Sequence, residues 1–478
     1  MNLFNYTRRE SSEVQIGCTP LGGDNPIRVQ SMTNTSTMDT EASVAQILRI
    51  AEAGGELVRL TTQGTREAEN MDLISQAVRR AGCPVPLVAD VHFNPNVADV
   101  AARYCEKVRI NPGNYVDAAR QFKQLEYTDE QYAQELQKIE DRLLPFLDIC
   151  REHGTAVRIG VNHGSLSDRI MSRYGDTPAG IVESCMEFLR ICVRHNFMNV
   201  VISIKASNTV VMVQSMRLLV QEMEKEGMTF PLHLGVTEAG EGEDGRIKSA
   251  VGIGALLTEG IGDTIRVSLS EAPEKEIPVA RQLVNMIPEC SRLRQEAEEG
   301  IKDDTVTLRL EASSLEELQL KAAMAVGAIF IDKKAHLLDI EAEGFDEATL
   351  RDLSDSILQA ARIKFVKTEY ISCPGCGRTL YDLEGTIHKI KAATAHLKGL
   401  KIAIMGCIVN GPGEMADADY GYVGAARGKV SLYKAKECIE KNIPEEEAVE
   451  RLLKFIEEDL REKGTLPLTP PQGEGSIM

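Results

Sequence analysis

The chain has 478 residues, of which 43% are hydrophobic, so it is long enough to bury more than one core. Its formal net charge of −18 disfavours nucleic acid and anionic membranes as partners, and an anionic ligand would need a local cationic pocket. No run of about 18 apolar residues predicts a membrane span, no export signal is visible, and eleven cysteines without such a signal indicate a reducing, cytoplasmic location.

From Ile27 to Ser270 the sequence repeats one unit eight times: a short β-branched strand, a polar loop and an amphipathic helix. Alternating strands and helices predict a parallel sheet, and eight units predict a closed (β/α)8 TIM barrel. An open doubly wound sheet is the alternative, which the lack of a GxGxxG turn after the first strand disfavours. The predicted strands are IRVQSM from Ile27, LVRLTT from Leu57, VPLVADVH from Val85, KVRINPG from Lys107, AVRIGVN from Ala156, VVISIKAS from Val200, PLHLGVTE from Pro231 and DTIRVSLS from Asp263.

The pattern changes after the barrel. We predict a substrate-binding barrel domain over residues 1–287, a small α/β insertion module over 288–364, a cysteine-bearing α+β domain over 365–463 and a disordered tail over 464–478. The insertion carries no catalytic signature. Its predicted elements are a charged lead from Cys290 to Asp304, a strand from Thr305 to Ala312, a helix from Leu315 to Val326, a strand pair from Ala328 to Ile340 and a helix from Asp346 to Arg362.

Polar side chains share one face of most predicted barrel strands. In LVRLTT, Arg59 and Thr61 have the same parity as Leu57, which we assign to the barrel interior, while Val58 and Leu60 face the helices. The polar positions fall at the carboxyl ends of the strands, where barrel enzymes place their chemistry. This register contains Arg59, Asp90, His92, Arg109, Asn111, Arg158, Asn162, Ser203, Lys205, Ser207, Arg266 and Ser268.

Five cations in this register would repel one another unless an anion lies among them, and guanidinium groups match phosphate oxygens, so we infer a diphosphate-like ligand. The alternative for any single arginine is an ion pair with a neighbouring carboxylate. The cations are Arg59, Arg109, Arg158, Lys205 and Arg266. Four groups that can exchange protons accompany them: Asp90, His92, His233 and Glu238.

Three cysteines and a glutamate form a candidate metal site. Cys373 and Cys376 stand in a CPGC turn between a strand and a helical stretch, and Cys407 follows a second strand. The glycines of the following IVNGPGE segment let Glu414 fold back to the same point. The spacing leaves structural zinc, an iron-sulfur cluster and a redox disulfide open. A carboxylate ligand on a cluster would leave one iron exchangeable.

At this point a set of motifs, in order over most of the chain, resembles the 4-hydroxy-3-methylbut-2-enyl diphosphate synthase family of the non-mevalonate isoprenoid pathway. The motifs are QSMTN from Gln30, VADVH from Val88, RINPG from Arg109, RIGVN from Arg158, TE from Thr237, GDTIR from Gly262, CPGC from Cys373 and GCIVNGPGE from Gly406. The segment 288–364 resembles a shortened form of the longer middle domain of plant-type members: its part from Gly327 to Lys364 resembles the end of that domain and follows a short charged lead. Two-domain members close their site between subunits, so a homodimer is expected here, and closure within one chain stays open.

The resemblance implies a reductive ring opening of 2-C-methyl-D-erythritol 2,4-cyclodiphosphate. It implies a 4Fe-4S cluster on Cys373, Cys376, Cys407 and Glu414, with reduced ferredoxin or flavodoxin as electron donor. In that picture the five cations hold the diphosphate, and Asn111, Asn162 and Ser268 add hydrogen bonds. The resemblance implies Glu238 as the catalytic acid near the cluster. Glu414, Asp90 and His92 are the other catalytic candidates.

Two other functions remain open from the sequence. One is an aldolase-type lyase in which Lys205 forms a Schiff base and the cysteines hold structural zinc. The other is an electron-transfer module in which the cationic mouth of the barrel is incidental.

Overall fold

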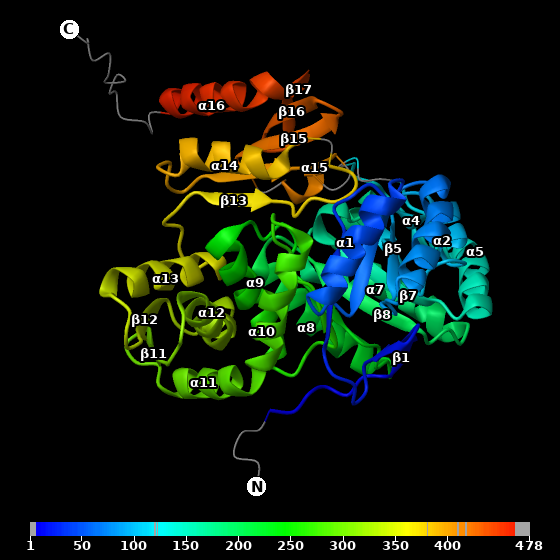
Figure 1. The fold of residues 1–478 in the computed structure, drawn as a ribbon, viewed down its shortest axis with the longest axis horizontal. Helices are drawn as coiled ribbons and strands as arrows, with labels where there is room; N and C mark the ends of the chain where they lie inside the picture. Colours follow the sequence, from blue (N-terminus) through cyan, green and yellow to red (C-terminus); the bar gives the residue numbers. More distant parts are fainter. Residues whose placement is uncertain are drawn as a thin grey trace.

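A computed structural model describes residues 6–118, 121, 123–379, 381–408, 411–415 and 418–463, and of Pro412 and Glu414 it describes the backbone alone. Figure 1 shows a barrel, coloured blue to green, with a second sheet domain in orange and red over one end. Helices coloured yellow-green lie beside the barrel. The predicted disordered tail, residues 464–478, lies outside the described residues.

The barrel is closed, as predicted. Eight parallel strands follow the order β8-β7-β6-β5-β4-β3-β10-β9, and a parallel bridge between Ile202 and Leu232 joins the two ends of this order. The open-sheet alternative is therefore wrong. The last two strands are shorter than predicted, although the Arg266 amide still donates to the Leu234 carbonyl beyond them, at 3.0 Å. The strands are β3 (Arg28–Met32), β4 (Leu57–Thr62), β5 (Leu87–Val91), β6 (Lys107–Ile110), β7 (Ala156–Asn162), β8 (Val200–Lys205), β9 (His233–Leu234) and β10 (Thr264–Ile265).

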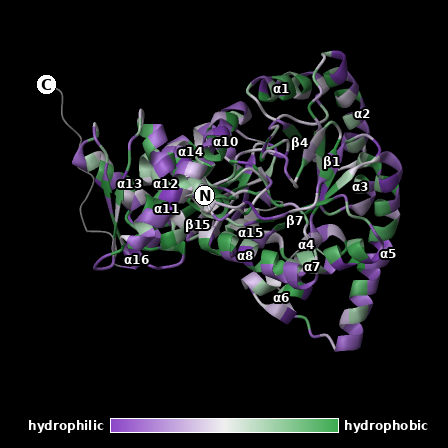
Figure 2. Ribbon diagram, turned by 90° about the horizontal axis from the view of Figure 1, so that it is seen from below, coloured by the Kyte–Doolittle hydropathy of each residue, from purple (hydrophilic) through white to green (hydrophobic). Residues whose placement is uncertain are grey.

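Helices surround the strands, and Figure 2 shows several of them around the barrel from below. Val58 and Leu60 pack in the core shared with these helices, which confirms the predicted strand parity. Leu57 instead packs against an amino-terminal hairpin, β1 (Val14–Ile16) and β2 (Thr19–Leu21), which covers the end of the barrel opposite the polar groups. The helices are α1 (Thr40–Glu52), α2 (Thr65–Arg80), α3 (Pro95–Ala101), α4 (Pro112–Tyr115), α5 (Asp129–His153), α6 (Asp168–Tyr174), α7 (Pro178–Arg194), α8 (Thr209–Lys225), α9 (Gly242–Leu257) and α10 (Glu276–Asn285).

The insertion packs on the barrel through α12 (Leu315–Ile331), whose buried residues belong to the same hydrophobic core. Gly327 permits this close packing, because a Cβ there would lie 2.8 Å from the Val251 carbonyl oxygen of α9. One prediction is wrong: the helix continues through Ile331, so no strand pair begins at Ala328. The charged lead, for which no helix or strand was predicted, is mostly helical. The other elements are α11 (Ile287–Glu299), β11 (Thr305–Arg309), β12 (Leu337–Glu341) and α13 (Glu347–Ala360).

This error has a physical cause. Every residue of α12 from Ala322 to Ile331 is buried and either apolar or glycine, so this part of the helix shows no helical periodicity. A run of β-branched and aromatic residues at its end then resembles a buried strand.

The cysteine-bearing domain is a five-stranded sheet in the order β13-β14-β15-β16-β17, parallel over its first three strands and antiparallel beyond. Its strands are β13 (Glu369–Ser372), β14 (Lys401–Met405), β15 (Tyr420–Ala426), β16 (Lys429–Lys434) and β17 (Glu437–Pro444). The helices α14 (Leu383–Thr394) and α16 (Glu445–Glu462) pack together in its core, and a short helix, α15 (Gly411–Glu414), follows β14.

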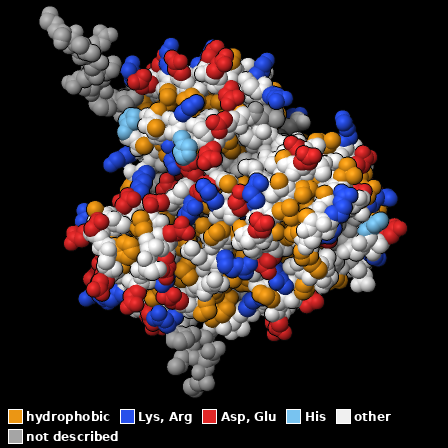
Figure 3. All heavy atoms as spheres, in the orientation of Figure 1, with side chains coloured by type: hydrophobic (Ala, Val, Ile, Leu, Met, Phe, Trp, Pro, Cys, Tyr) orange, Lys and Arg blue, Asp and Glu red, His pale blue; other side chains and the backbone are white. Residues whose placement is uncertain are grey.

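On the face drawn in Figure 3, acidic and basic side chains are interspersed. Within the described ranges, no helix combines the length and the apolar character needed to cross a bilayer. All the cysteines of the chain are free thiols.

Candidate active site

A cavity of about 80 Å³ lies where the carboxyl ends of the barrel strands meet the cysteine loops. Most of the predicted site residues line it, from both parts of the chain. From the barrel these are Arg59, Asp90, His92, Arg109, Asn162, Lys205, Glu238, Arg266 and Ser268, and from the other domain Cys373, Cys376 and Cys407. The two sets are far apart in the sequence, so this fold brings a cationic mouth and three thiols to one place.

Contacts within one chain join the two sides of this cavity. The Ser270 hydroxyl donates to the Cys373 carbonyl at 2.9 Å, and the Lys248 ammonium lies 3.2 Å from the Glu369 carboxylate. A Cβ at Gly413 would lie 1.7 Å from the Gly164 carbonyl oxygen, so only glycine permits α15 to approach the barrel this closely. The barrel mouth and the cysteine loops therefore meet within one chain, which the sequence left open. A homodimer stays a prediction.

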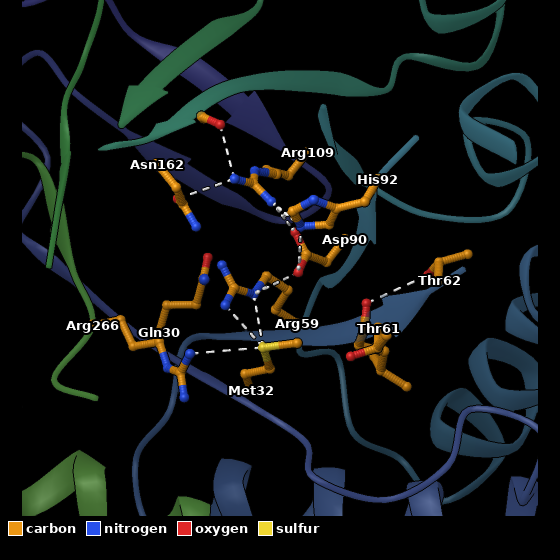
Figure 4. A network of polar contacts seen from close by, with 12 residues as sticks. Gln30, Met32, Arg59, Thr61, Thr62, Asp90, His92, Arg109, Asn162 and Arg266 are labelled. Carbon is orange, nitrogen blue, oxygen red and sulfur yellow. Dashed lines mark hydrogen bonds and ion pairs between the residues drawn. The ribbon is translucent and has the colours of Figure 1, made fainter. Parts of the chain in front are cut away.

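Arg109 is the most connected cation of the cavity (Figure 4). Its guanidinium donates to Asp90 at 2.9 Å, to the Gly160 carbonyl at 2.8 Å and to Asn162 at 3.2 Å, and it lies 2.5 Å from the His92 ring. Burial, followed by the charge of Arg109, lowers the pKa of His92 to about 3. Burial alone would raise the pKa of Asp90, but Arg59 and Arg109 bring it well below its ordinary value. At neutral pH we therefore expect a neutral imidazole beside a carboxylate.

Arg59 and Arg266 both point at the sulfur of Met32 (Figure 4). The Met32 sulfur lies 2.8 Å from an Arg59 nitrogen and 3.7 Å from one of Arg266. Arg266 also forms a bidentate pair with the buried Glu276, at 2.9 and 3.1 Å, whereas Arg59 is 4.0 Å from Asp90. Burial lowers the pKa of Arg59 to about 10, which leaves the guanidinium charged at neutral pH. A thioether is a weak acceptor, so Arg59 keeps donor capacity for a ligand.

Two of the predicted binding residues do not line the cavity. Arg158 is 1% exposed, and its Nε and one Nη have no hydrogen-bond partner among the described residues. Asn111 caps α4 through the Gly113 amide and donates to Ser165 at 2.8 Å. His233 is also fully buried, with both ring nitrogens unpartnered in the described part of the chain.

Lys205 lines the cavity from the end of β8. A Cβ at Gly235 would lie 2.6 Å from its Nζ, so the small residue leaves space for the ammonium. Burial, followed by the charges of Arg59 and Arg158, lowers the pKa of Lys205 well below its ordinary value.

Glu238 has the features of a proton donor. Burial raises its pKa, so its protonated form persists to higher pH than for an exposed glutamate. Its Oε2 is buried without a hydrogen-bond partner among the described residues. Its backbone has a φ of +47°, a conformation that non-glycine residues rarely adopt and that concentrates at functional sites.

The three thiols lie on loops that follow β13 and β14. The Gly406 amide donates to the Cys373 sulfur at 3.1 Å, and burial raises the pKa of this thiol to about 12. A hydrogen bond between Cys376 and Cys407 lowers the pKa of the first thiol and raises that of the second. Among the described side chains, no three of His, Cys, Asp or Glu are grouped so that they would hold a single metal ion. The Glu414 side chain lies outside the described residues.

Sequence reasoning missed four residues of the site. Arg378, Met32 and Thr237 line the cavity, and Glu276 anchors Arg266. Arg378 follows Cys376 by two residues, so its place beside a cysteine turn was the available signal. Glu276 begins α10, outside every strand register, and no pattern pointed to it.

Comparison with known proteins agrees with this arrangement. Residues 11–281 match the GcpE TIM-barrel domain, and residues 369–458 match the GcpE protein C-terminal domain. A Bacteroides thetaiotaomicron protein named 4-hydroxy-3-methylbut-2-en-1-yl diphosphate synthase (flavodoxin) is 53% identical, over 97% of this chain and 100% of its own. Proteins of the same name from Akkermansia muciniphila and Leptospira interrogans are 41% and 36% identical, each over 95% of this chain and 97% of their own.

The alignment with the Bacteroides protein spans 610 positions, which exceeds the 478 residues here, so it contains positions without a counterpart in this chain. Among solved structures, a dihydropteroate synthase from Stenotrophomonas maltophilia covers 61% of this chain at 14% identity, with a TM-score of 0.39, too low to bear on function. The barrel match extends over more than half of the chain, and the relatives match along nearly all of it. The chain belongs to the GcpE family.

Proposed function

We propose that this chain catalyses the reductive ring opening of 2-C-methyl-D-erythritol 2,4-cyclodiphosphate to 4-hydroxy-3-methylbut-2-enyl diphosphate, with electrons delivered through a 4Fe-4S cluster. One observation carries the proposal: a single cavity in which barrel cations face three cysteine thiols. The names of the relatives support the same reaction. It consumes two electrons and two protons, breaks the ring C–O bond and releases one water.

An excess of positive charge in the cavity favours a diphosphate ligand. Arg109 and Arg266 each have a close carboxylate, but the nearest carboxylate oxygen to Arg59 is 4.0 Å away. Lys205 has no carboxylate within 4 Å among the described residues. Unpaired buried cations are costly, and a ligand with several anionic oxygens would offset that cost. The proposed binding set is Arg59, Arg109, Asn111, Arg158, Asn162, Lys205, Arg266 and Ser268.

The thiols of Cys373, Cys376 and Cys407 fit a cluster, since soft thiolate ligands line one side of the cavity. Glu414 is proposed as the fourth ligand. A bound cluster would supply single electrons at low potential. Replacing Glu414 by alanine is expected to loosen the cluster, with iron content as the readout.

The remaining chemistry belongs to the chain's own side chains. The cations hold the diphosphate in place, and Asn162 and Ser268, which line the cavity, donate hydrogen bonds to it. Glu238 holds a proton for the departing hydroxyl, because burial raises its pKa. Asp90 and His92 are the less favoured acids: Asp90 is ionised at neutral pH, and the pKa of His92 is lowered to about 3, chiefly by burial.

Flavodoxin is the proposed electron donor, since the names of the relatives specify it, and ferredoxin is the alternative. The proposal includes a cytoplasmic location, a homodimer and no nucleic-acid or membrane partner. The free cysteines agree with a reducing compartment.

The test is iron and sulfide analysis of protein purified without oxygen, with EPR spectra before and after addition of the cyclodiphosphate. We expect about four iron and four sulfide per chain and a spectrum that the cyclodiphosphate alters. Colourless protein with stoichiometric zinc would contradict the proposal. Trapping of the substrate on Lys205 by borohydride would instead support the lyase.

A further inference from the structure

Arg378 is the cation that the cysteine-bearing domain contributes to the lining of the cavity. The residue is 8% exposed and belongs to the turn that carries Cys376. Packing against the barrel fixes this turn, because a Cβ at Gly377 would lie 2.6 Å from the Thr35 carbonyl oxygen. The Thr379 hydroxyl also accepts a hydrogen bond from the Cys376 amide, at 3.2 Å. The guanidinium is therefore held at the boundary between the two domains.

This guanidinium is only partly satisfied. Its closest carboxylate is Asp90, 3.9 Å away, which is longer than a hydrogen bond. Its Nε and one Nη are buried without a hydrogen-bond partner in the described part of the chain. Buried donors without partners are rare in folded proteins, because their lost hydration is not replaced.

Asp90 is not a close ion-pair partner of Arg378, whereas Glu276 is one of Arg266. The Asp90 carboxylate is already engaged by Arg109 at 2.9 Å, with Arg59 at 4.0 Å. Three guanidinium groups thus share one carboxylate. On the other side, the Arg378 guanidinium has the Cys376 side chain as a hydrogen-bond partner, yet its Nε and one Nη are still without a partner among the described residues. A donor with unused capacity therefore faces the cavity from the cysteine-bearing domain.

We propose that Arg378 binds a phosphate oxygen of the ligand, so that the ligand itself joins the cysteine-bearing domain to the barrel. The identity of the anion rests on the proposed function; the contact rests on the unsatisfied guanidinium. The other binding cations all belong to the barrel. Arg378 thus makes substrate binding depend on the closed arrangement of the two domains.

The experiment compares Arg378→Gln and Arg378→Lys with the wild type, all carrying oxidised clusters. Anaerobic calorimetry measures binding of the cyclodiphosphate, and inorganic pyrophosphate is a second probe. Loss of a buried charged hydrogen bond is expected to weaken binding of both ligands about ten- to hundredfold in Arg378→Gln, and less in Arg378→Lys. Iron content and the EPR spectrum without ligand should stay as in the wild type.

Lys389→Gln is the matched control, because it removes one positive charge from an exposed position on the same domain. Ligand binding by this variant should be unchanged. Binding by Arg378→Gln within twofold of the wild type would overturn the proposal, and so would loss of iron in both Arg378 variants, since the residue would then serve the thiolates.

A wild type that fails to bind the cyclodiphosphate would contradict the proposed function separately. In that case the pyrophosphate measurement decides. Weaker binding of pyrophosphate by Arg378→Gln than by the wild type supports the contact, and equal binding overturns it.

Discussion

The two walls of the cavity are built in different ways. The barrel wall places its cations at strand ends, where hydrogen bonds between strands fix each backbone position. The cysteine wall consists of turns, held by the close approach of glycines such as Gly377 and Gly413 to the barrel. The barrel can therefore present a charged mouth alone, while the thiols depend on contact between the domains.

The largest effect is expected on the cysteine wall. Cys376→Ala removes one of three thiols from the cavity, so we expect loss of the cluster and of all measurable turnover. Iron and sulfide content with visible absorbance checks this outcome. Cys438→Ala, at a half-buried position on β17, is the control and should keep its iron. A Cys376→Ala variant with full iron content would remove this residue from the ligand set.

The second prediction concerns Glu238, which lines the cavity from the barrel wall and faces the thiols of the cysteine wall. If the protonated carboxyl donates to the leaving hydroxyl, turnover should fall as pH rises through its pKa, which burial raises. Glu238→Gln should lower kcat about 10²- to 10⁴-fold and abolish this alkaline limb. The pH dependence of kcat, measured for both proteins, gives the answer. Glu243→Gln, at an exposed position on α9, should behave as the wild type, and an unchanged profile in Glu238→Gln would exclude the role.

Within the barrel wall, paired and unpaired cations should differ in stability. Arg266→Met leaves Glu276 buried without its partner, so we expect a loss of about 3–5 kcal/mol of unfolding free energy. Arg158→Met removes a buried cation with two unpartnered nitrogens, so the ligand-free protein should be at least as stable as the wild type. Denaturant unfolding without ligand compares the two.

Ligand binding should weaken in both variants. An Arg158→Met variant as destabilised as Arg266→Met would show that Arg158 has a structural partner.

Strand parity was enough to predict the barrel wall, because the period of two fixes which side chains face inward. Strand parity did not reveal how far from the mouth of the barrel each inward side chain lies. Arg109 and Arg158 both face inward, yet only Arg109 lines the cavity. Depth depends on strand tilt and on neighbouring side chains, which a single strand does not record.

The cysteine spacing predicted the other wall, but Arg378 had no periodic signal. The joining of the walls within one chain was also hidden from the sequence, because it depends on contacts between distant residues such as Ser270 and Cys373.

The smallest expected effect concerns the attachment between the walls. Glu369 of β13 lies between Lys248 of α9 and Arg362, and although burial alone would raise its pKa, these two cations lower it to about 2. A lowered pKa in the folded protein means that the charged pair stabilises the fold above the pKa of the unfolded chain. This stability is lost as pH falls from about 4.5 towards 2.

Glu369→Gln should therefore cost about 1–3 kcal/mol at pH 7, since the buried Lys248 and the half-buried Arg362 then lack a carboxylate between them. The difference from the wild type should shrink as the pH approaches 2. Thermal unfolding over this pH range measures it. Glu341→Gln, in an exposed pair with Arg309, should leave stability unchanged, because surface pairs contribute little. A constant difference at every pH would mean that Glu369 acts through packing, and that charge does not hold the cysteine wall to the barrel.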